Sequence, residues 1–227
     1  EVKRLAQRSE QLGFDLTLIA ELFLNDIKGV EAPSLDAWTT AAAVAAVTER
    51  LELMVAVRPT FHEPAIFAKQ AACLDQLSGG RLALNVVSSW WADEARRYGI
   101  RFDAHDDRYA RTEEWLTVLD GAWRGPGFTF RGRHYQVEDL LVSPGPLRRP
   151  RPTIFAGGES EAAKRLIAAR CDAYVMHGDP PANVGPKIAD MRERRAALGL
   201  PPMQFGVAAY VIVRDREQDA QRELARI

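Results

Sequence analysis

The segment GGRLALNVVSSWWADEARRYGIRFDAHDDRY, residues 79–109, decides how the chain folds. Within it Arg81–Val87 is apolar and rich in β-branched residues, which is typical of a strand buried on both faces of a parallel sheet. The strand ends in hydrogen-bonding side chains and two adjacent indoles: Asn85, Ser88, Ser89, Trp90 and Trp91. Because ligands of parallel α/β folds bind at the carboxyl ends of the strands, the segment predicts the floor of a ligand site.

Strands and helices alternate on both sides of this segment without a break in composition. The predicted strands cover residues 14–20, 51–57, 81–87, 153–156, 173–176 and 205–213. The longer predicted helices cover residues 1–12, 35–47, 64–77, 107–123, 160–170 and 183–198, and another begins at 219. Asp106 is the expected N-cap of the helix over 107–123.

This alternation without a Rossmann glycine motif favours an α/β fold of the (β/α)8 TIM-barrel type over a doubly wound sheet. A complete barrel takes about 250 residues, and this chain opens and stops in a helix. We therefore interpret the strands as the second to seventh of a barrel, with the first and last absent from the chain given, in a single domain over residues 1–227. Residues 125–152 interrupt the alternation with a predicted β-hairpin, FTFRGRHYQV, and a Pro-rich connector.

The composition is that of an ordinary globular protein, with 47% hydrophobic residues and 30 Lys+Arg against 31 Asp+Glu. This balance argues against a nucleic-acid partner or an anionic membrane surface, and no apolar run approaches the roughly 20 residues of a membrane span. No signal peptide is expected. Cys73 and Cys171 are far apart and outside any CxxC motif, so both are predicted to be buried thiols of a cytoplasmic protein.

Several short motifs follow predicted strands. Asn85 either binds the edge of a heterocycle or caps a neighbouring loop. Gly157–Ser160 either binds phosphate with free N–H groups at a helix start or is a plain loop with a serine cap, and its acidic residues count against phosphate. Arg108 and Tyr109 either bind phosphate or belong to a surface salt-bridge cluster.

Two histidines lie in loops that follow predicted strands, where a base or proton donor is useful. These are His62, after residues 51–57, and His177, after residues 173–176. No histidine pair has metal-ligand spacing, so no metal site is predicted. The absence of GxSxG, Walker A and GxGxxG motifs argues against a hydrolase, an NTPase and a Rossmann enzyme.

Taken together, the motifs NVVSSW, HDDRY and AGGES resemble those of the bacterial luciferase-like flavin-dependent monooxygenases. The similarity is greatest to the two-component branch that uses reduced FMN and includes alkanesulfonate and dimethyl sulfone monooxygenases and pyrimidine oxygenase. The family fold is a TIM barrel with FMN at its carboxyl-end face. The resemblance implies that the region 125–152 is an insertion over the active site.

The resemblance also implies roles for particular residues. Asn85 would contact the isoalloxazine ring and Glu94 the ribityl chain or its surroundings. The flavin phosphate would be held by Arg108, Tyr109, Gly158 and Ser160. Ala20, Glu21 and Ala56 would line the flavin pocket, while His62, His177 and Tyr210 are the candidate catalytic residues. Tyr210 is equally expected as a plain barrel-lining aromatic.

The chemistry implied by the resemblance is monooxygenation of a small organic substrate. A separate NAD(P)H:flavin reductase would supply FMNH2, and O2 would add at flavin C4a to give the oxygenating peroxide. Alkanesulfonate monooxygenases carry Arg and His where this chain has Ala208 and Tyr210, which favours a neutral or weakly polar substrate. A homodimer or homotetramer is expected by resemblance alone. The alternatives are an F420-dependent oxidoreductase and a flavin-binding protein without catalysis.

Overall fold

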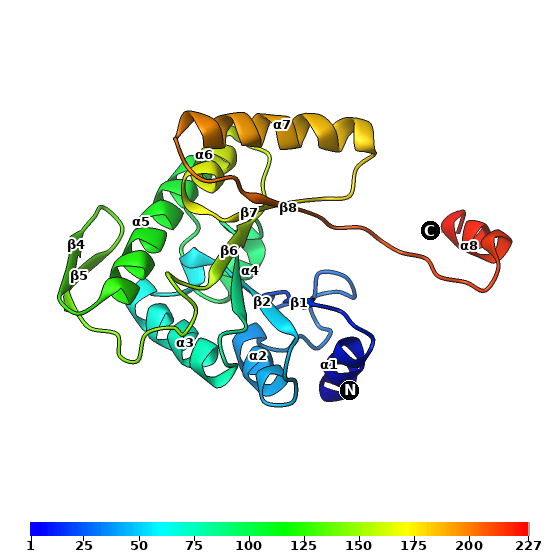
Figure 1. Ribbon diagram of the computed structural model, residues 1–227, viewed down its shortest axis with the longest axis horizontal. Coiled ribbons are helices and arrows are strands. Elements are labelled where there is room, and N and C mark those ends of the chain that lie inside the picture. The colour runs from blue at the N-terminus through cyan, green and yellow to red at the C-terminus, as the bar shows by residue number, and fades with distance from the viewer. Residues whose placement is uncertain (227) are drawn as a thin grey trace.

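The computed structural model describes residues 1–226 and contains a parallel sheet with helices packed around it (Figure 1). Its strands are β1 (Leu16–Ile19), β2 (Glu52–Val57), β3 (Leu82–Val86), β6 (Thr153–Ala156), β7 (Ala173–Met176) and β8 (Gln204–Val207). They are hydrogen-bonded in the order β1-β2-β3-β6-β7-β8, with every pairing parallel. Neighbours in sequence are therefore neighbours in the sheet, as in the wall of a barrel, and the predicted α/β fold is confirmed.

The register explains why these strands read as continuous apolar runs. Val55 of β2 lies opposite Leu84 of β3, which lies opposite Ile154 of β6. All of these side chains are essentially buried, because they face the helices. The next row, Ala56, Asn85 and Phe155, points to the other face. A single polar residue in β3 is thereby directed away from the helix layer.

The helices connect successive strands and cover the sheet. They are α1 (Val2–Gln11), α2 (Ala37–Ala45), α3 (Pro64–Leu77), α4 (Ala92–Arg97), α5 (His105–Arg124), α6 (Glu161–Arg170), α7 (Pro181–Ala197) and α8 (Glu217–Leu224), with a 3₁₀ turn, η1 (Pro59–Phe61). Trp115 of α5 has no exposed surface and packs its ring 4.8 Å from that of Phe67 in α3. No helix of residues 1–226 is long and apolar enough to cross a membrane.

Three sequence predictions are wrong in detail. The strand predicted over 205–213 ends at Val207, which lies opposite Met176, the last residue of β7. Helix α8 lies at the end of an extended segment (Figure 1). Helix α5 begins at His105, so its N-cap is Ala104 and not Asp106. Cys73 is exposed on α3, whereas Cys171 is buried as predicted, and burial raises the pKa of its thiol to about 12.

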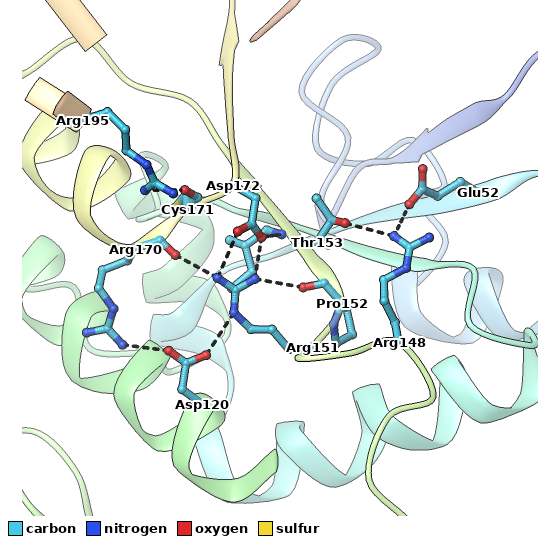
Figure 2. Close-up of polar contacts among 11 residues, drawn as sticks. Glu52, Asp120, Arg148, Arg151, Pro152, Thr153, Arg170, Cys171, Asp172 and Arg195 are labelled. Atoms are coloured by element: carbon cyan, nitrogen blue, oxygen red, sulfur yellow. Dashed lines mark hydrogen bonds and ion pairs between the residues drawn. The ribbon is translucent and has the colours of Figure 1, made fainter. Parts of the chain in front are cut away.

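Ion pairs hold together the amino-terminal ends of the strands (Figure 2). Arg151, just before β6, contacts Asp172, just before β7, and its Nε donates to Asp120 of α5 at 3.1 Å. Arg148 bonds Glu52 at the start of β2 and Thr153 at the start of β6. These ion pairs stabilise the fold and do not form part of a ligand site, since ligand sites of such folds lie at the opposite ends of the strands.

The hairpin predicted within residues 125–152 is present as β4 (Phe128–Arg131) and β5 (Gln136–Leu140). It packs on the outer side of α5 (Figure 1). Glu114 of α5 accepts hydrogen bonds from the turn, at 2.9 Å from the N–H of Arg133 and 2.8 Å from that of His134. Tyr135 reaches further and donates from its hydroxyl to the Pro59 carbonyl at 3.1 Å.

We expect Glu114→Gln to lower the free energy of unfolding by about 1–2 kcal/mol at neutral pH, because hydrogen bonds to a charged group are lost. Burial opposes ionisation of Glu114, but the N–H groups of the turn outweigh burial and lower its pKa below the ordinary 4.5. A lowered pKa stabilises the fold above the unfolded-state pKa, and this stabilisation disappears as the pH falls through the folded-state value. The difference between wild type and Glu114→Gln should therefore shrink below about pH 4.5 in urea titrations. Glu113→Gln, at the exposed neighbouring position, is the control and should show no such difference.

Candidate functional site

A groove of about 570 Å³ opens at the carboxyl ends of β3, β6 and β7. It is lined by Leu18, Asn85, Val87, Ser88, Ser89, Trp90, Tyr109, Gly157, Gly158, Glu159, Tyr174, Val175, Met176, His177 and Ala208. Its volume suits a small-molecule ligand. A hollow of about 620 Å³ between α5, α6 and α7 is lined by outer helix surfaces, so the strand-end groove is the better candidate.

The loop after β6 has two glycines, Gly157 and Gly158, that pack too closely against their neighbours to carry a side chain. A Cβ at Gly157 would lie 2.8 Å from the Val175 carbonyl oxygen, and one at Gly158 would lie 2.7 Å from the Ala163 Cβ. Gly158 also has a φ of +150°, which favours glycine. The loop thus approaches β7 and α6 more closely than any side chain would allow.

The same loop presents hydrogen-bond donors at the start of α6. Ser160 caps the helix by accepting from the Ala163 N–H at 3.2 Å. Within residues 1–226, the N–H groups of Gly158 and Glu159 make no hydrogen bond. Free N–H groups beside the positive end of a helix dipole form a site suited to an anion such as phosphate.

The carboxylates at this loop and at the start of α6 are paired with cations of α7. Glu159 accepts from Lys187 Nζ at 2.5 Å, and Glu161 accepts from Arg194 Nη2 at 2.9 Å. Hydrogen bonds from Lys187 to Asp179 and then to Glu159 raise the pKa of that ammonium, so it remains charged. The acidic residues that argued against an anion site in the sequence are therefore paired elsewhere.

Tyr109 and Arg108, on the first turn of α5, lie at the same end of the groove. The Tyr109 hydroxyl is 3.3 Å from where a Cβ of Gly158 would stand. Arg108 donates from Nε to the Ser88 carbonyl at 3.2 Å and from Nη1 to the Asp103 carbonyl at 2.8 Å. Its guanidinium is thereby fixed at the end of β3, as a binding residue requires.

A buried charge cluster lies beside the groove, at the carboxyl ends of β1 and β2. The Arg58 guanidinium contacts Glu94 of α4 and Glu21, its Nε lying 3.4 Å from Glu21 Oε2. Glu21 also lies 2.6 Å from His62 Nε2. Glu94 accepts from the backbone N–H of Phe23 at 2.7 Å. This charge cluster of Glu21, Arg58, Glu94 and His62 connects the loop after β1 to the end of β2 and to α4.

The groove brings together Asn85, Tyr109, Gly158 and His177, with Arg108 and Ser160 at its edge. It does not include Glu21, Glu94 or His62, which are engaged in the charge cluster, and Glu94 has no exposed surface. Ala20 and Ala56 do not line it either, although Ala56 is the register partner of Asn85. The sequence predicts Tyr210 on the last strand, facing the barrel interior. In the structure β8 ends at Val207, so Tyr210 lies beyond the strand and is fully exposed.

Sequence reasoning assigned no role to Tyr174, which also lines the groove. The Tyr174 hydroxyl donates to the Gly158 carbonyl at 3.1 Å and so holds the glycine loop. Burial raises the pKa of this hydroxyl, with a smaller effect of Glu159, which keeps it protonated as a donor. A tyrosine in an otherwise apolar strand, AYVM, is the signal that marks it.

Comparisons with known proteins show which family the chain belongs to. The chain is 38% identical over 226 residues to an FMNH2-dependent dimethylsulfone monooxygenase of Pseudomonas putida, covering 99% of this chain and 61% of the relative. It is 36% identical over 225 residues to the protein of that name in Pseudomonas fluorescens, covering 99% and 60%. The chain thus spans about three fifths of the length of these relatives.

Among solved structures, a riboflavin lyase crystallised with modified FMN and riboflavin superposes with a TM-score of 0.90 at 21% identity, covering 99% of this chain and 58% of that one. This similarity supports the fold. The sequence of residues 1–227 matches the family described as luciferase-like monooxygenase over its whole length. The chain belongs to the luciferase-like monooxygenase family.

Proposed function

We propose that the protein to which this chain belongs is an FMNH2-dependent monooxygenase. It inserts one atom of O2 into a small organic substrate: RH, O2 and FMNH2 yield ROH, water and FMN. Reduced flavin supplies the electrons that activate O2. The two most similar relatives named above, both FMNH2-dependent dimethylsulfone monooxygenases, support this reading and do not favour the F420 alternative.

The observation that carries the proposal is the donor-rich loop Gly157–Ser160, whose one carboxylate, Glu159, is paired with Lys187. Phosphate of FMN fits there, against the unpaired N–H groups and beside Arg108, Tyr109 and Ser160. Asn85, on the groove-facing row of β3, would then hydrogen-bond the edge of the ring. Ala20 and Ala56 would supply apolar walls nearby.

Glu21 and Glu94 act on this site as positioning residues in the proposal, because both carboxylates bind Arg58. His177, exposed in the groove, is the better placed proton donor, while His62 supports Glu21. A neutral substrate fits the groove wall at Ala208, which offers no cation for a sulfonate. Dimethyl sulfone is the first substrate to test.

Several features of the working enzyme belong to the same proposal. A separate NAD(P)H:flavin reductase delivers FMNH2 in the cytoplasm, which suits a chain whose Pseudomonas relatives are named for their dependence on FMNH2. The protein assembles as a homodimer or homotetramer. The segment 125–152 contributes no residue to the groove lining and its hairpin packs on the outer side of α5, so its place over the active site rests on the resemblance alone.

The test combines binding with isotope transfer. The protein should bind reduced FMN without oxygen, and with a flavin reductase, NADH, dimethyl sulfone and ¹⁸O2 it should release an ¹⁸O-labelled product detected by mass spectrometry. Asn85→Ala should weaken binding of reduced FMN. Tight flavin binding without substrate-dependent label would indicate a flavin carrier, and preference for reduced F420 would indicate a hydride-transfer enzyme; either result contradicts the proposal.

A further inference from the structure

Ser89, three residues beyond the end of β3 at Val86, has an unfavourable backbone conformation and an unpaired hydroxyl. Its φ is +61°, in the left-handed region that serine adopts at a cost. Its side chain lines the groove and is 7% exposed. Within residues 1–226, its Oγ has no hydrogen-bond partner.

Each of these features lowers stability, and they coincide at one residue. A buried hydroxyl without a partner forfeits the hydrogen bonds it makes in water. Glycine would adopt the same backbone without strain and would leave no hydroxyl unpaired. Strained residues with unsatisfied polar groups cluster at ligand sites, where a bound molecule supplies the missing partner.

The neighbours of Ser89 indicate which part of a ligand it meets. The adjacent Ser88 receives a hydrogen bond on its carbonyl from Arg108, and its Oγ lies 3.1 Å from Thr112 Oγ1 of α5. Ser89 is therefore fixed beside the first turns of α5, where Tyr109 meets Gly158. This is the anion-suited end of the groove.

We propose that the Ser89 hydroxyl donates a hydrogen bond to a phosphate oxygen of bound FMN. This assignment rests on the proposed function. It adds a side-chain donor from the loop after β3 to the donors of the Gly157–Ser160 loop and of α5, so that the phosphate is contacted from three parts of the chain. It also explains why a serine stands where the backbone favours glycine.

The experiment compares Ser89→Ala and Ser89→Gly with wild type in anaerobic titrations of reduced FMN and reduced riboflavin, which lacks the phosphate. Both variants should bind reduced FMN about three- to tenfold more weakly, as for one lost hydrogen bond. Both should bind reduced riboflavin as wild type does. Without flavin, the Tm of Ser89→Ala should equal or exceed that of wild type, and Ser89→Gly should be higher still.

Ser88→Ala is the matched control for stability, because Ser88 has a partner in Thr112 and its loss should lower the Tm. Unchanged FMN affinity in the Ser89 variants would overturn the assignment, as would equal losses for FMN and riboflavin. A lowered Tm in both variants would show that Ser89 serves the fold instead. If wild type binds neither flavin, the proposed function fails and the assignment fails with it.

Discussion

Arg58→Met should lower the free energy of unfolding by about 3–5 kcal/mol, the usual cost of removing one partner from a buried ion pair. Arg58, Glu21 and Glu94 are all nearly inaccessible to solvent. Methionine fills much of the space but leaves the buried carboxylates of Glu21 and Glu94 without the guanidinium that they share. The measurement is urea unfolding at neutral pH, followed by tryptophan fluorescence and circular dichroism.

The comparison variant is Arg96→Met on α4. Arg96 pairs with Asp93, but both side chains are well exposed, at 71% and 43%. Exposed pairs contribute about 0.2–1 kcal/mol, so this substitution should have little effect. The same chemical change thereby separates burial of the charge from loss of an arginine.

A second substitution tests whether the cost arises from the stranded carboxylates. Adding Glu94→Gln to Arg58→Met removes one of the unpaired charges, so the double variant should be less destabilised than the sum of the single variants. Simple additivity, or a loss below about 1 kcal/mol in Arg58→Met, would contradict a charge cluster that holds β2 and α4 together.

The fold was predictable because its information is local. The apolar run 82–86 gives β3, and Pro64 marks the first turn of α3. The end of β8 was not predictable, because a strand continues only while a neighbour pairs with it, and residues 208–213 remain apolar after β7 has ended. The hydrophobic pattern of a segment does not show where the neighbouring strand ends.

Asn85, Gly158 and His177 lie at or just beyond the ends of their own strands, so the sequence alone could place them at the groove that they line. The sequence could not show which side chains pair across long separations along the chain. In the sequence, Glu94 has the appearance of a solvent-exposed helix carboxylate, yet it forms a buried ion pair with Arg58, 36 residues earlier. Conversely, the negative charge of Glu159 argues against phosphate binding in the sequence, but Lys187, 28 residues later, pairs with that charge.

Gly158→Ala should weaken binding of reduced FMN by at least about tenfold, equivalent to about 1.4 kcal/mol. The new Cβ would stand 2.7 Å from the Ala163 Cβ, so the start of α6 has to move. It would also stand 3.3 Å from the Tyr109 hydroxyl, so the contact between α5 and the loop has to change. Anaerobic fluorescence titration measures the affinity.

The same substitution should destabilise the fold by about 1–3 kcal/mol, because alanine at a φ of +150° is strained. Gly185→Ala, in the exposed part of α7, is the control for FMN binding and should leave it unchanged, because the new Cβ meets no other part of the molecule. Its effect on stability should be small, because Pro186 after it disfavours a helical alanine and offsets the usual gain. A loss of FMN affinity confined to position 158 would show that this position requires glycine for its conformation and its close approach. Wild-type FMN affinity in Gly158→Ala would instead remove the loop from the phosphate site, since no shift of α6 and Tyr109 of this size leaves a hydrogen-bonded anion undisturbed.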